Sequence, residues 1–162
     1  MQDFLKQKGW KVNKYIIQNL SKNDISEIIE IQKELGIHIV SEKSLIEDLN
    51  IENYNYFALK TNNSKTKLIG FVGISKIFDS MDLLSIVIAK EFQKLGYGNV
   101  LLNHIINLAK ENNISTIMLE VRESNFPAQR LYEKNGFKLI NKRKNYYSDN
   151  KENALIYTLK ID

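Results

Sequence analysis

The chain has 162 residues, the size of a single domain, which is enough to bury a sizeable hydrophobic core. Its content of 43% hydrophobic and 26% charged residues is that of a globular protein and excludes a disordered or membrane-embedded chain. The absence of cysteine excludes disulfides, thiolate zinc sites and a cysteine nucleophile, and the net charge of +4 indicates a solvated, lysine-rich surface.

The first half of the chain predicts a short arm at residues 1–13, followed by strands and two helices. Asp24 is expected to cap the first helix, with Glu27 as its partner in a capping box, and Gly36 is expected to close it. Ser41 begins a second, shorter helix. The strands expected in this half cover residues 15–17, 54–61, 67–77 and 81–89.

The second half predicts a long amphipathic helix, because apolar residues recur at helical spacing from Val100 to Ala109. A strand at residues 116–122, a helix around residues 128–134 and two final strands complete the chain. Runs of adjacent strands, with helices placed between others, indicate an α+β fold with a mixed, mostly antiparallel central sheet of about seven strands flanked by about four helices. We expect residues 14–162 to form this fold as one domain.

The run Gln-Lys-Leu-Gly-Tyr-Gly at residues 93–98 lies between the apolar run of residues 83–89, which is typical of a buried strand, and the long helix. A strand that turns over two glycines into a helix presents unpaired N–H groups and the positive end of a helix dipole, and such a nest binds phosphate. The third glycine of a dinucleotide-binding fingerprint and the Gly-Lys-Ser/Thr ending of a P-loop are both missing. The run therefore predicts another phosphorylated cofactor, although glycine turns before helices also occur without a ligand.

Three blocks of the sequence resemble the GNAT superfamily of acetyltransferases. Residues 93–98 are similar to its acetyl-CoA pyrophosphate loop, Gln/Arg-x-x-Gly-x-Gly/Ala. Asn125, followed by Leu-Tyr-Glu-Lys-Asn-Gly-Phe at residues 131–137, is similar to its second conserved block. Residues 142–147 and 152–157 resemble the RimI-type subgroup, whose members acetylate the N-terminal alanine of a ribosomal protein.

This resemblance covers about residues 80–160 and implies a GNAT fold with acetyl-CoA as cosubstrate and no metal. The chain departs from the family at Asn99, where a basic residue is common, and before Ser41, where a Pro-Trp pair is missing. The residues that the resemblance places against acetyl-CoA are Ile86, Val87, Ile88, Gln93, Lys94, Leu95, Gly96, Tyr97, Gly98, Asn99 and Asn125.

The resemblance also implies two catalytic residues. Glu120, inside the apolar strand at residues 116–122, would take the proton from the attacking amine, and Tyr132 would donate a proton or hydrogen bond to the leaving thiolate. The residues alone leave alternatives open. Glu120 either faces solvent or is partly buried, as would suit a base, and it could instead pair with Arg122 or a lysine; Tyr132 could pack against Phe137 in the core.

Tyr146 and Tyr147, together with the basic run at residues 142–144, would flank an acceptor peptide according to the RimI-type resemblance, or else the tyrosines bound a surface hairpin. The expected reaction is direct acetyl transfer, in a ternary complex, to the N-terminal α-amine of a protein such as a small-subunit ribosomal protein. Two alternatives stay open, namely acetylation of a small amine such as a polyamine or amino acid, and a CoA-binding module without catalysis. We expect a cytoplasmic monomer or weak dimer that contacts neither nucleic acid nor membrane directly.

Overall fold

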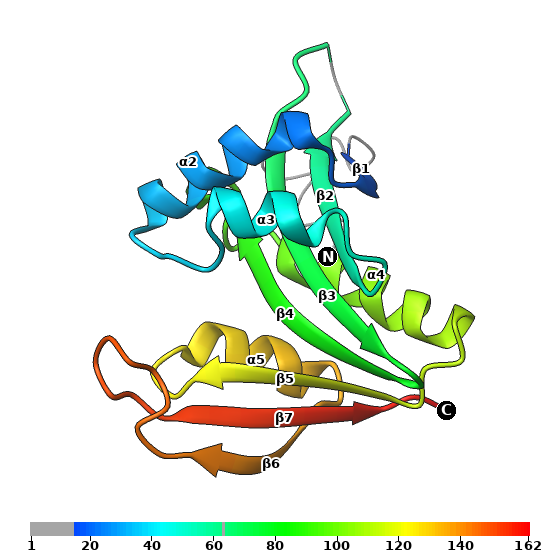
Figure 1. The fold of residues 1–162 in the computed structure, drawn as a ribbon, viewed down its shortest axis with the longest axis vertical. Coiled ribbons are helices and arrows are strands. Elements are labelled where there is room, and N and C mark those ends of the chain that lie inside the picture. Colours follow the sequence, from blue (N-terminus) through cyan, green and yellow to red (C-terminus); the bar gives the residue numbers. More distant parts are fainter. Residues whose placement is uncertain (1–14, 63) are drawn as a thin grey trace. The chain divides into compact units, whose positions relative to one another are not determined.

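The computed structural model describes residues 15–62 and 64–162, so the arm expected at residues 1–13 lies outside the described residues. Seven strands, four α-helices and two short 3-10 helices are found in the described part (Figure 1). The strands are β1 (Tyr15–Asn19), β2 (Tyr54–Thr61), β3 (Leu68–Ile77), β4 (Ser80–Ile88), β5 (Thr116–Arg122), β6 (Lys138–Arg143) and β7 (Ala154–Lys160). The helices are η1 (Lys22–Asp24), α2 (Ile25–Leu35), α3 (Glu42–Asp48), η2 (Lys90–Phe92), α4 (Tyr97–Glu111) and α5 (Phe126–Lys134).

The strands form one mixed sheet in the order β1-β2-β3-β4-β5-β7-β6. The pairs β1–β2, β5–β7 and β6–β7 are antiparallel, whereas β4 and β5 are parallel and are joined through a crossover that contains α4. The expected α+β fold is therefore confirmed. None of the helices within the described residues is long and apolar enough to cross a membrane.

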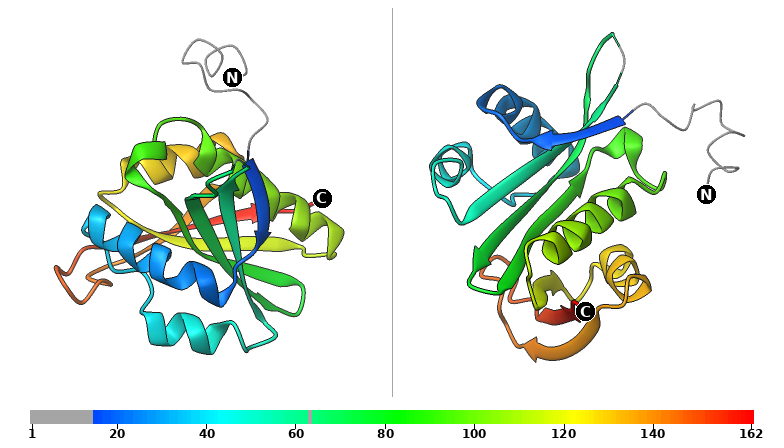
Figure 2. Two further views of the ribbon diagram at one scale, coloured as in Figure 1. Left: turned by 90° about the horizontal axis from the view of Figure 1, so that it is seen from above. Right: turned by 90° about the vertical axis from the view of Figure 1, so that its right-hand side faces the viewer.

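The described chain divides into two compact units. The first combines the described residues up to Gly73 with Ser85–Leu102, and the second combines Ile74–Leu84 with Asn103–Asp162. In the first unit, α2 and α3 lie on one face of β2 and β3 (Figure 2). The amphipathic pattern explains this packing, because Ile28 of α2 and Leu45 of α3 are fully buried.

The start of α2 differs from the sequence prediction, because Asp24 does not form a capping box with Glu27. Its carboxylate accepts a hydrogen bond from the backbone N–H of Ser21 (2.9 Å), in the capping box of η1, and pairs with the ammonium group of Lys60 on β2. The side chains of Asp24 and Lys60 are only 7% and 11% exposed. A buried charge needs a partner of opposite charge, so the ion pair prevails over the local cap.

β4 is not buried along its whole length, contrary to the prediction for residues 83–89. Its side chains alternate, since Leu83 and Val87 are buried whereas Leu84 is 43% exposed. The pairing of β4 with β5 extends from Ser80 to Leu83. Branched and leucine side chains suit a half-buried strand as well as a fully buried one. The apolar run therefore predicted the strand correctly, but the predicted burial of both its faces was wrong.

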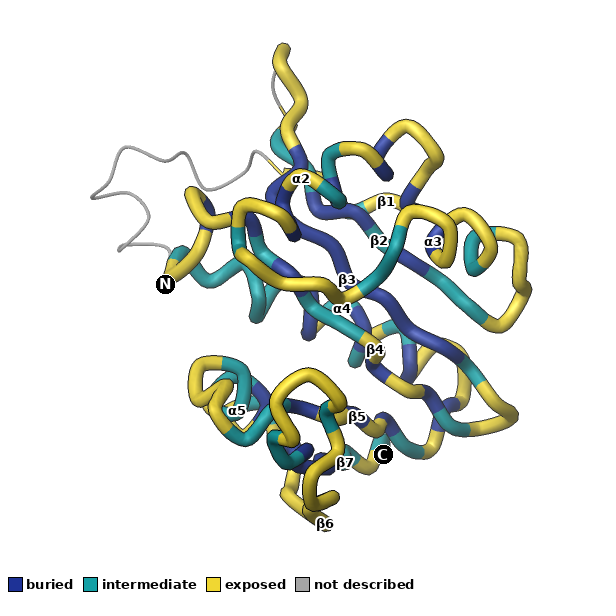
Figure 3. The backbone as a smooth tube through the Cα atoms, turned by 60° about the vertical axis from the view of Figure 1, so that its left-hand side comes forward, coloured by how far each residue is buried: buried dark blue, intermediate teal, exposed yellow. Residues whose placement is uncertain are grey.

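In the second unit, β7 lies between β5 and β6, and β6 is exposed along its length (Figure 3). Ile117, Leu119 and Val121 of β5 are buried, and the intervening side chains face the other way. α5 begins with Asn125 as its cap and Pro127 in its first turn, and Gly136 follows its end with a φ of 87°.

Candidate active site

The loop at residues 93–98 has the backbone of an anion-binding nest. Lys94 and Gly96 have positive φ angles of 61° and 89°. Within the described part of the chain, no backbone carbonyl accepts a hydrogen bond from the N–H groups of residues 94–98, and α4 begins at Tyr97. Two residues with positive φ thus stand directly before the positive end of a long helix, an arrangement that fits a phosphate group.

Two kinds of contact support this loop in the first unit. The side-chain amide of Gln93 donates a hydrogen bond to the carbonyl oxygen of Ile88 (3.1 Å), which ties the start of the loop to the end of β4. The ring of Tyr97 meets those of Tyr15 and Phe92 edge-on, with centroids 6.0 and 6.1 Å apart, and burial raises the pKa of Tyr97. Gln93 and Tyr97, predicted as cofactor contacts, thus also hold the loop itself.

The apolar residues predicted to contact the cofactor lie at the end of β4. Val87 is buried, whereas Ile86 and Ile88 are half-buried and share one face of the strand. Gly70 of β3 lies so close to this segment that a Cβ atom there would clash with the carbonyl oxygen of Val87 and the side chain of Ile88. The glycine therefore permits the close approach of the two strands.

Glu120 lies on β5, one residue beyond Leu119, which pairs with Leu83 of β4. Its side chain is 31% exposed and points away from the buried Leu119 and Val121, so β5 presents the carboxylate to solvent. Nη1 of Arg143, at the end of β6, lies 2.5 Å from Oε1 of Glu120. The sequence suggested Arg122 or a lysine as the partner of Glu120. The structure shows a different partner, Arg143.

Two further polar groups interact with Glu120. The phenol of Tyr146 interacts with the Glu120 carboxylate, and this interaction raises the pKa of Tyr146. Asp82 lies on β4 opposite Met118, and burial, followed by the negative charge of Glu120, raises the pKa of Asp82. A guanidinium, a phenol and a second carboxylate therefore surround the proposed base.

Tyr132 is part of the core of the second unit. Its side chain is 7% exposed, and its ring centroid lies 5.7 Å from that of Phe137 and 6.4 Å from that of Tyr157. Burial raises the pKa of Tyr132 to about 12, so the phenol keeps its proton at neutral pH. The packing against Phe137 that the sequence allowed is confirmed, and it is compatible with a role as hydrogen-bond donor.

Asn125 begins the helix that carries Tyr132. Its side-chain oxygen accepts a hydrogen bond from the backbone N–H of Ala128 (3.2 Å), so Asn125 caps α5. The side-chain amide of Gln129 donates to the carbonyl oxygens of Arg122 (3.2 Å) and Glu123 (2.8 Å). These bonds fix the corner between β5 and α5.

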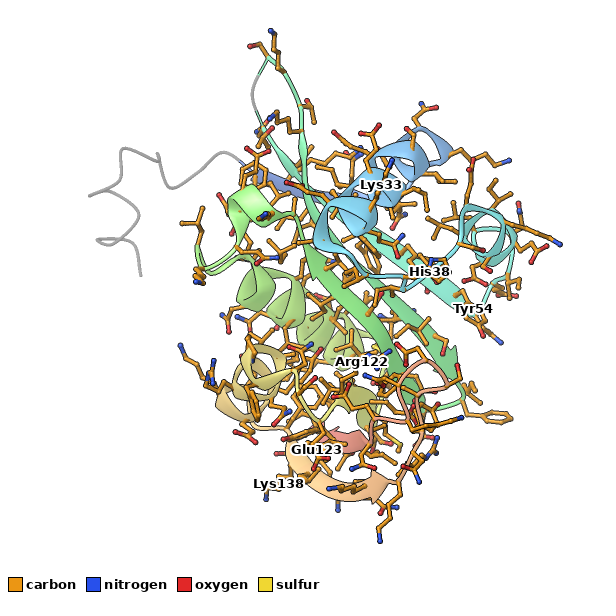
Figure 4. All side chains as sticks on the ribbon, turned by 90° about the vertical axis from the view of Figure 1, so that its left-hand side faces the viewer. Lys33, His38, Tyr54, Arg122, Glu123 and Lys138 are labelled. Atoms are coloured by element: carbon orange, nitrogen blue, oxygen red, sulfur yellow. The ribbon has the colours of Figure 1, made fainter. Side chains whose placement is uncertain are left out.

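The loop between β6 and β7 carries Tyr146 and Tyr147, whose rings meet edge-on with centroids 5.3 Å apart. Arg122 of β5 anchors this loop (Figure 4). Its guanidinium lies 3.8 Å from the ring centroid of Tyr147 and donates hydrogen bonds to the carboxylates of Asp149 (2.8 Å) and Glu152 (3.2 Å).

Glu152 joins the same loop to the corner between β5 and α5. Interactions with the hydroxyl and the backbone N–H of Ser124, the latter a hydrogen bond of 2.6 Å, lower the pKa of Glu152 from 4.5 to about 2. Asn153 donates to the carboxylate of Glu123 (2.6 Å) and accepts a hydrogen bond from the N–H of Asn145 (3.0 Å). Polar contacts at both ends therefore set the conformation of the loop.

Reasoning from sequence missed the partners of these predicted residues. Arg122 lies two residues after Glu120 and therefore on the same face of β5. This spacing could have predicted that the Arg122 side chain lies near the site. The contacts of Arg122 with Asp149 and Glu152 carried no such signal, because a loop has no periodicity that places its side chains. The reach of Arg143 from β6 to β5 depends on the strand order, which the sequence did not supply.

The chain is similar to known proteins over most of its length. Residues 25–137 match the model of the acetyltransferase (GNAT) family. The ribosomal protein bS18-alanine N-acetyltransferase of Haemophilus ducreyi is 33% identical over 89% of this chain and 99% of its own length, and that of Haemophilus influenzae is 35% identical over 87% and 95%. The crystal structure of the Escherichia coli ribosomal-protein-S18-alanine N-acetyltransferase superposes with a TM-score of 0.81 at 31% identity, covering 91% of this chain and 94% of that one. This chain therefore belongs to the acetyltransferase (GNAT) family.

Proposed function

We propose that this protein acetylates the N-terminal α-amine of another protein, with acetyl-CoA as donor and alanine as the favoured first residue. The similarity to bS18-alanine N-acetyltransferases over nearly the whole chain supports this acceptor. The observation that carries the proposal is the pair of groups in the second unit, where the accessible carboxylate of Glu120 is accompanied by the buried, protonated phenol of Tyr132.

The nest at residues 93–98 would hold the pyrophosphate of CoA through its backbone N–H groups, with the positive φ of Gly96 shaping it. Ile86, Ile88 and Asn125 would contact the pantetheine arm. Bound acetyl-CoA supplies an activated thioester, whose carbonyl carbon accepts an amine and whose sulfur leaves. The chain itself has to orient the two reactants and move the protons.

Glu120 would take the proton from the acceptor's α-ammonium group, directly or through water, and so free the nitrogen lone pair for attack. An α-ammonium group has a pKa of about 8, whereas a lysine ammonium has a pKa of about 10.4. Deprotonation near neutral pH is therefore much easier for an N-terminus than for a lysine side chain. One exposed carboxylate is adequate for that task.

Tyr132 would donate a hydrogen bond to the leaving sulfur. Its pKa of about 12 lies above the pKa of about 8.5 typical of a thiol, so complete transfer of the phenol proton to the thiolate is unfavourable. Hydrogen-bond donation stabilises the developing negative charge without that transfer. The nitrogen loses a second proton as the C–N bond forms and the C–S bond breaks, and this proton reaches the leaving thiolate through water. The proton that Glu120 has taken returns to solvent, so the products are the acetylated amine, CoA thiol and one released proton.

A small polyamine is the second candidate acceptor, because Asp82 adds a carboxylate near Glu120. Two negative charges attract an acceptor with several positive charges. The tyrosine-bearing loop at residues 144–153, which is fixed by many polar contacts, favours an extended peptide instead.

Replacing Glu120 by glutamine tests the proposal in a steady-state assay with a peptide that begins with alanine. We expect kcat to fall by about 100-fold, as is typical when a general base is removed. Glu111→Gln, which removes a carboxylate at the exposed end of α4, is the control and should leave kcat unchanged. Full activity of Glu120→Gln would remove Glu120 from the proton transfer.

A further inference from the structure

The guanidinium of Arg143 places a positive charge beside the carboxylate of Glu120, the proposed base. Its guanidinium pairs with Glu120 and lies 5.3 Å from the ring centroid of Tyr146, and its side chain is 51% exposed. To reach β5 from β6, the arginine has to pass β7, which lies between these strands. On β7, Ala154 pairs with Arg143 on one side and with Arg122 on the other.

An acceptor's α-ammonium group would bind the Glu120 carboxylate through the same kind of contact as the guanidinium of Arg143. Both are cations that donate N–H hydrogen bonds, and the proposed proton transfer needs the ammonium group within hydrogen-bond reach of Glu120. A carboxylate has two oxygens and a limited number of acceptor positions, and Arg143 already occupies one of the oxygens, Oε1. Two cations on one carboxylate also repel each other. Arg143 and the acceptor therefore compete for Glu120.

We propose that Arg143 stands in for the acceptor's α-ammonium group on Glu120 and gives way to it, so that the site selects a positively charged N-terminus. This inference rests on the proposed function, in which Glu120 meets the acceptor amine.

Two observations make the exchange physically reasonable. The ion pair is solvent-exposed, and exposed ion pairs contribute little stability, so a bound acceptor can displace Arg143 at small cost. When Arg143 is displaced, the negative charges of Glu120 and Asp82 lack a positive partner. An α-ammonium group neutralises this charge, whereas a blocked, uncharged N-terminus does not. The ring of Tyr146 remains as a second partner for the displaced guanidinium.

Calorimetric titration with two peptides tests the exchange. One peptide begins with a free alanine and the other is identical but acetylated at its N-terminus. We expect Arg143→Gln to bind the free peptide about threefold more tightly than the wild type does, and the blocked peptide equally well. Arg143→Lys keeps the charge and should bind as the wild type does. Lys138→Gln, which removes an exposed charge at the other end of β6, is the control and should bind both peptides as the wild type does.

Equal changes for both peptides, or weaker binding of the free peptide by Arg143→Gln, would overturn the proposal and make Arg143 a support of the loop. In a Glu120→Gln background, Arg143→Gln should no longer improve binding, since the competition is for that carboxylate. Failure of the wild type to acetylate any free N-terminus would reject the proposed function and the exchange with it. Normal acetylation without the gain in affinity would reject the exchange alone.

Discussion

The guanidinium of Arg122 lies 3.8 Å from the ring centroid of Tyr147, so one side chain of β5 is in cation–π contact with the loop between β6 and β7. The same guanidinium binds the carboxylates of Asp149 and Glu152 in that loop. Arg122 therefore sets the conformation of the segment that carries both tyrosines proposed to flank the acceptor.

Replacing Arg122 by glutamine should raise the KM for an acceptor peptide by about threefold to tenfold, because the loop loses its cation–π contact and both ion pairs. The turnover number at saturating peptide and the affinity for acetyl-CoA should change little. Steady-state kinetics with varied peptide, together with calorimetry of acetyl-CoA binding, measures both. Arg130→Gln on the exposed face of α5 serves as the control, and an unchanged peptide KM in Arg122→Gln would detach the loop from acceptor binding.

The pKa of Glu152 predicts how this anchoring depends on pH. Its pKa is about 2 in the folded chain and 4.5 ordinarily, so the ionised carboxylate stabilises the fold fully above about pH 4.5. That contribution is lost as the pH falls from 4.5 towards 2. Thermal melting of the wild type and Glu152→Gln should differ most at neutral pH and converge below pH 4.5. A difference in melting temperature that stays constant down to pH 3 would show that ionisation of Glu152 is not its source.

The fold could be read from the sequence where local signals decide the structure. The expected strands at residues 54–61 and 116–122 agree with β2 and β5, and Gly36 and Gly136 mark helix ends with positive φ angles. Local signals failed where a distant charge intervened. Asp24 has the residue type of a helix cap, yet Lys60, far along the chain, takes its carboxylate.

The same limit applies to the candidate site. The glycine turn, Glu120 and Tyr132 could be found because motif spacing and strand pattern identify them. The partners of Glu120 could not, since the strand order that brings Arg143 of β6 within reach of β5 leaves no local pattern in the sequence. The roles of the predicted contact residues in binding acetyl-CoA stay predictions that substitution has to test.

Gly96→Val should weaken acetyl-CoA binding by at least about tenfold, which is about 1.4 kcal/mol. The reason is that a β-branched side chain strains a backbone with a φ of 89° and also blocks the approach of a phosphate to the N–H groups. Gly36→Val is a matched control, because Gly36 has a φ of 65° and nothing lies within 4 Å of the place where its Cβ would be. Equal affinity for acetyl-CoA in the two folded variants, measured by calorimetry, would exclude the loop from the cofactor site.

Tyr132→Phe should lower kcat by at least about tenfold while leaving acetyl-CoA affinity and the melting temperature nearly unchanged. The ring keeps its packing against Phe137 and Tyr157, so only the hydrogen-bond donor is lost. Tyr157→Phe is the matched control, because burial also raises the pKa of Tyr157 to about 12 but its hydroxyl donates to Glu133. A kcat that falls equally in both variants would point to a general effect of losing a core hydroxyl.

Mass spectrometry of acetylated peptides tests the acceptor most directly. The wild type is incubated with acetyl-CoA and a peptide that begins with alanine and contains internal lysines, with the same peptide blocked at its N-terminus, and with spermidine. We predict acetylation on the α-amine of the free peptide and none on the blocked one, because the α-ammonium group loses its proton more readily than lysine does. Acetylation confined to lysine side chains, or turnover of spermidine without any peptide product, would contradict N-terminal acetylation as the function of this protein.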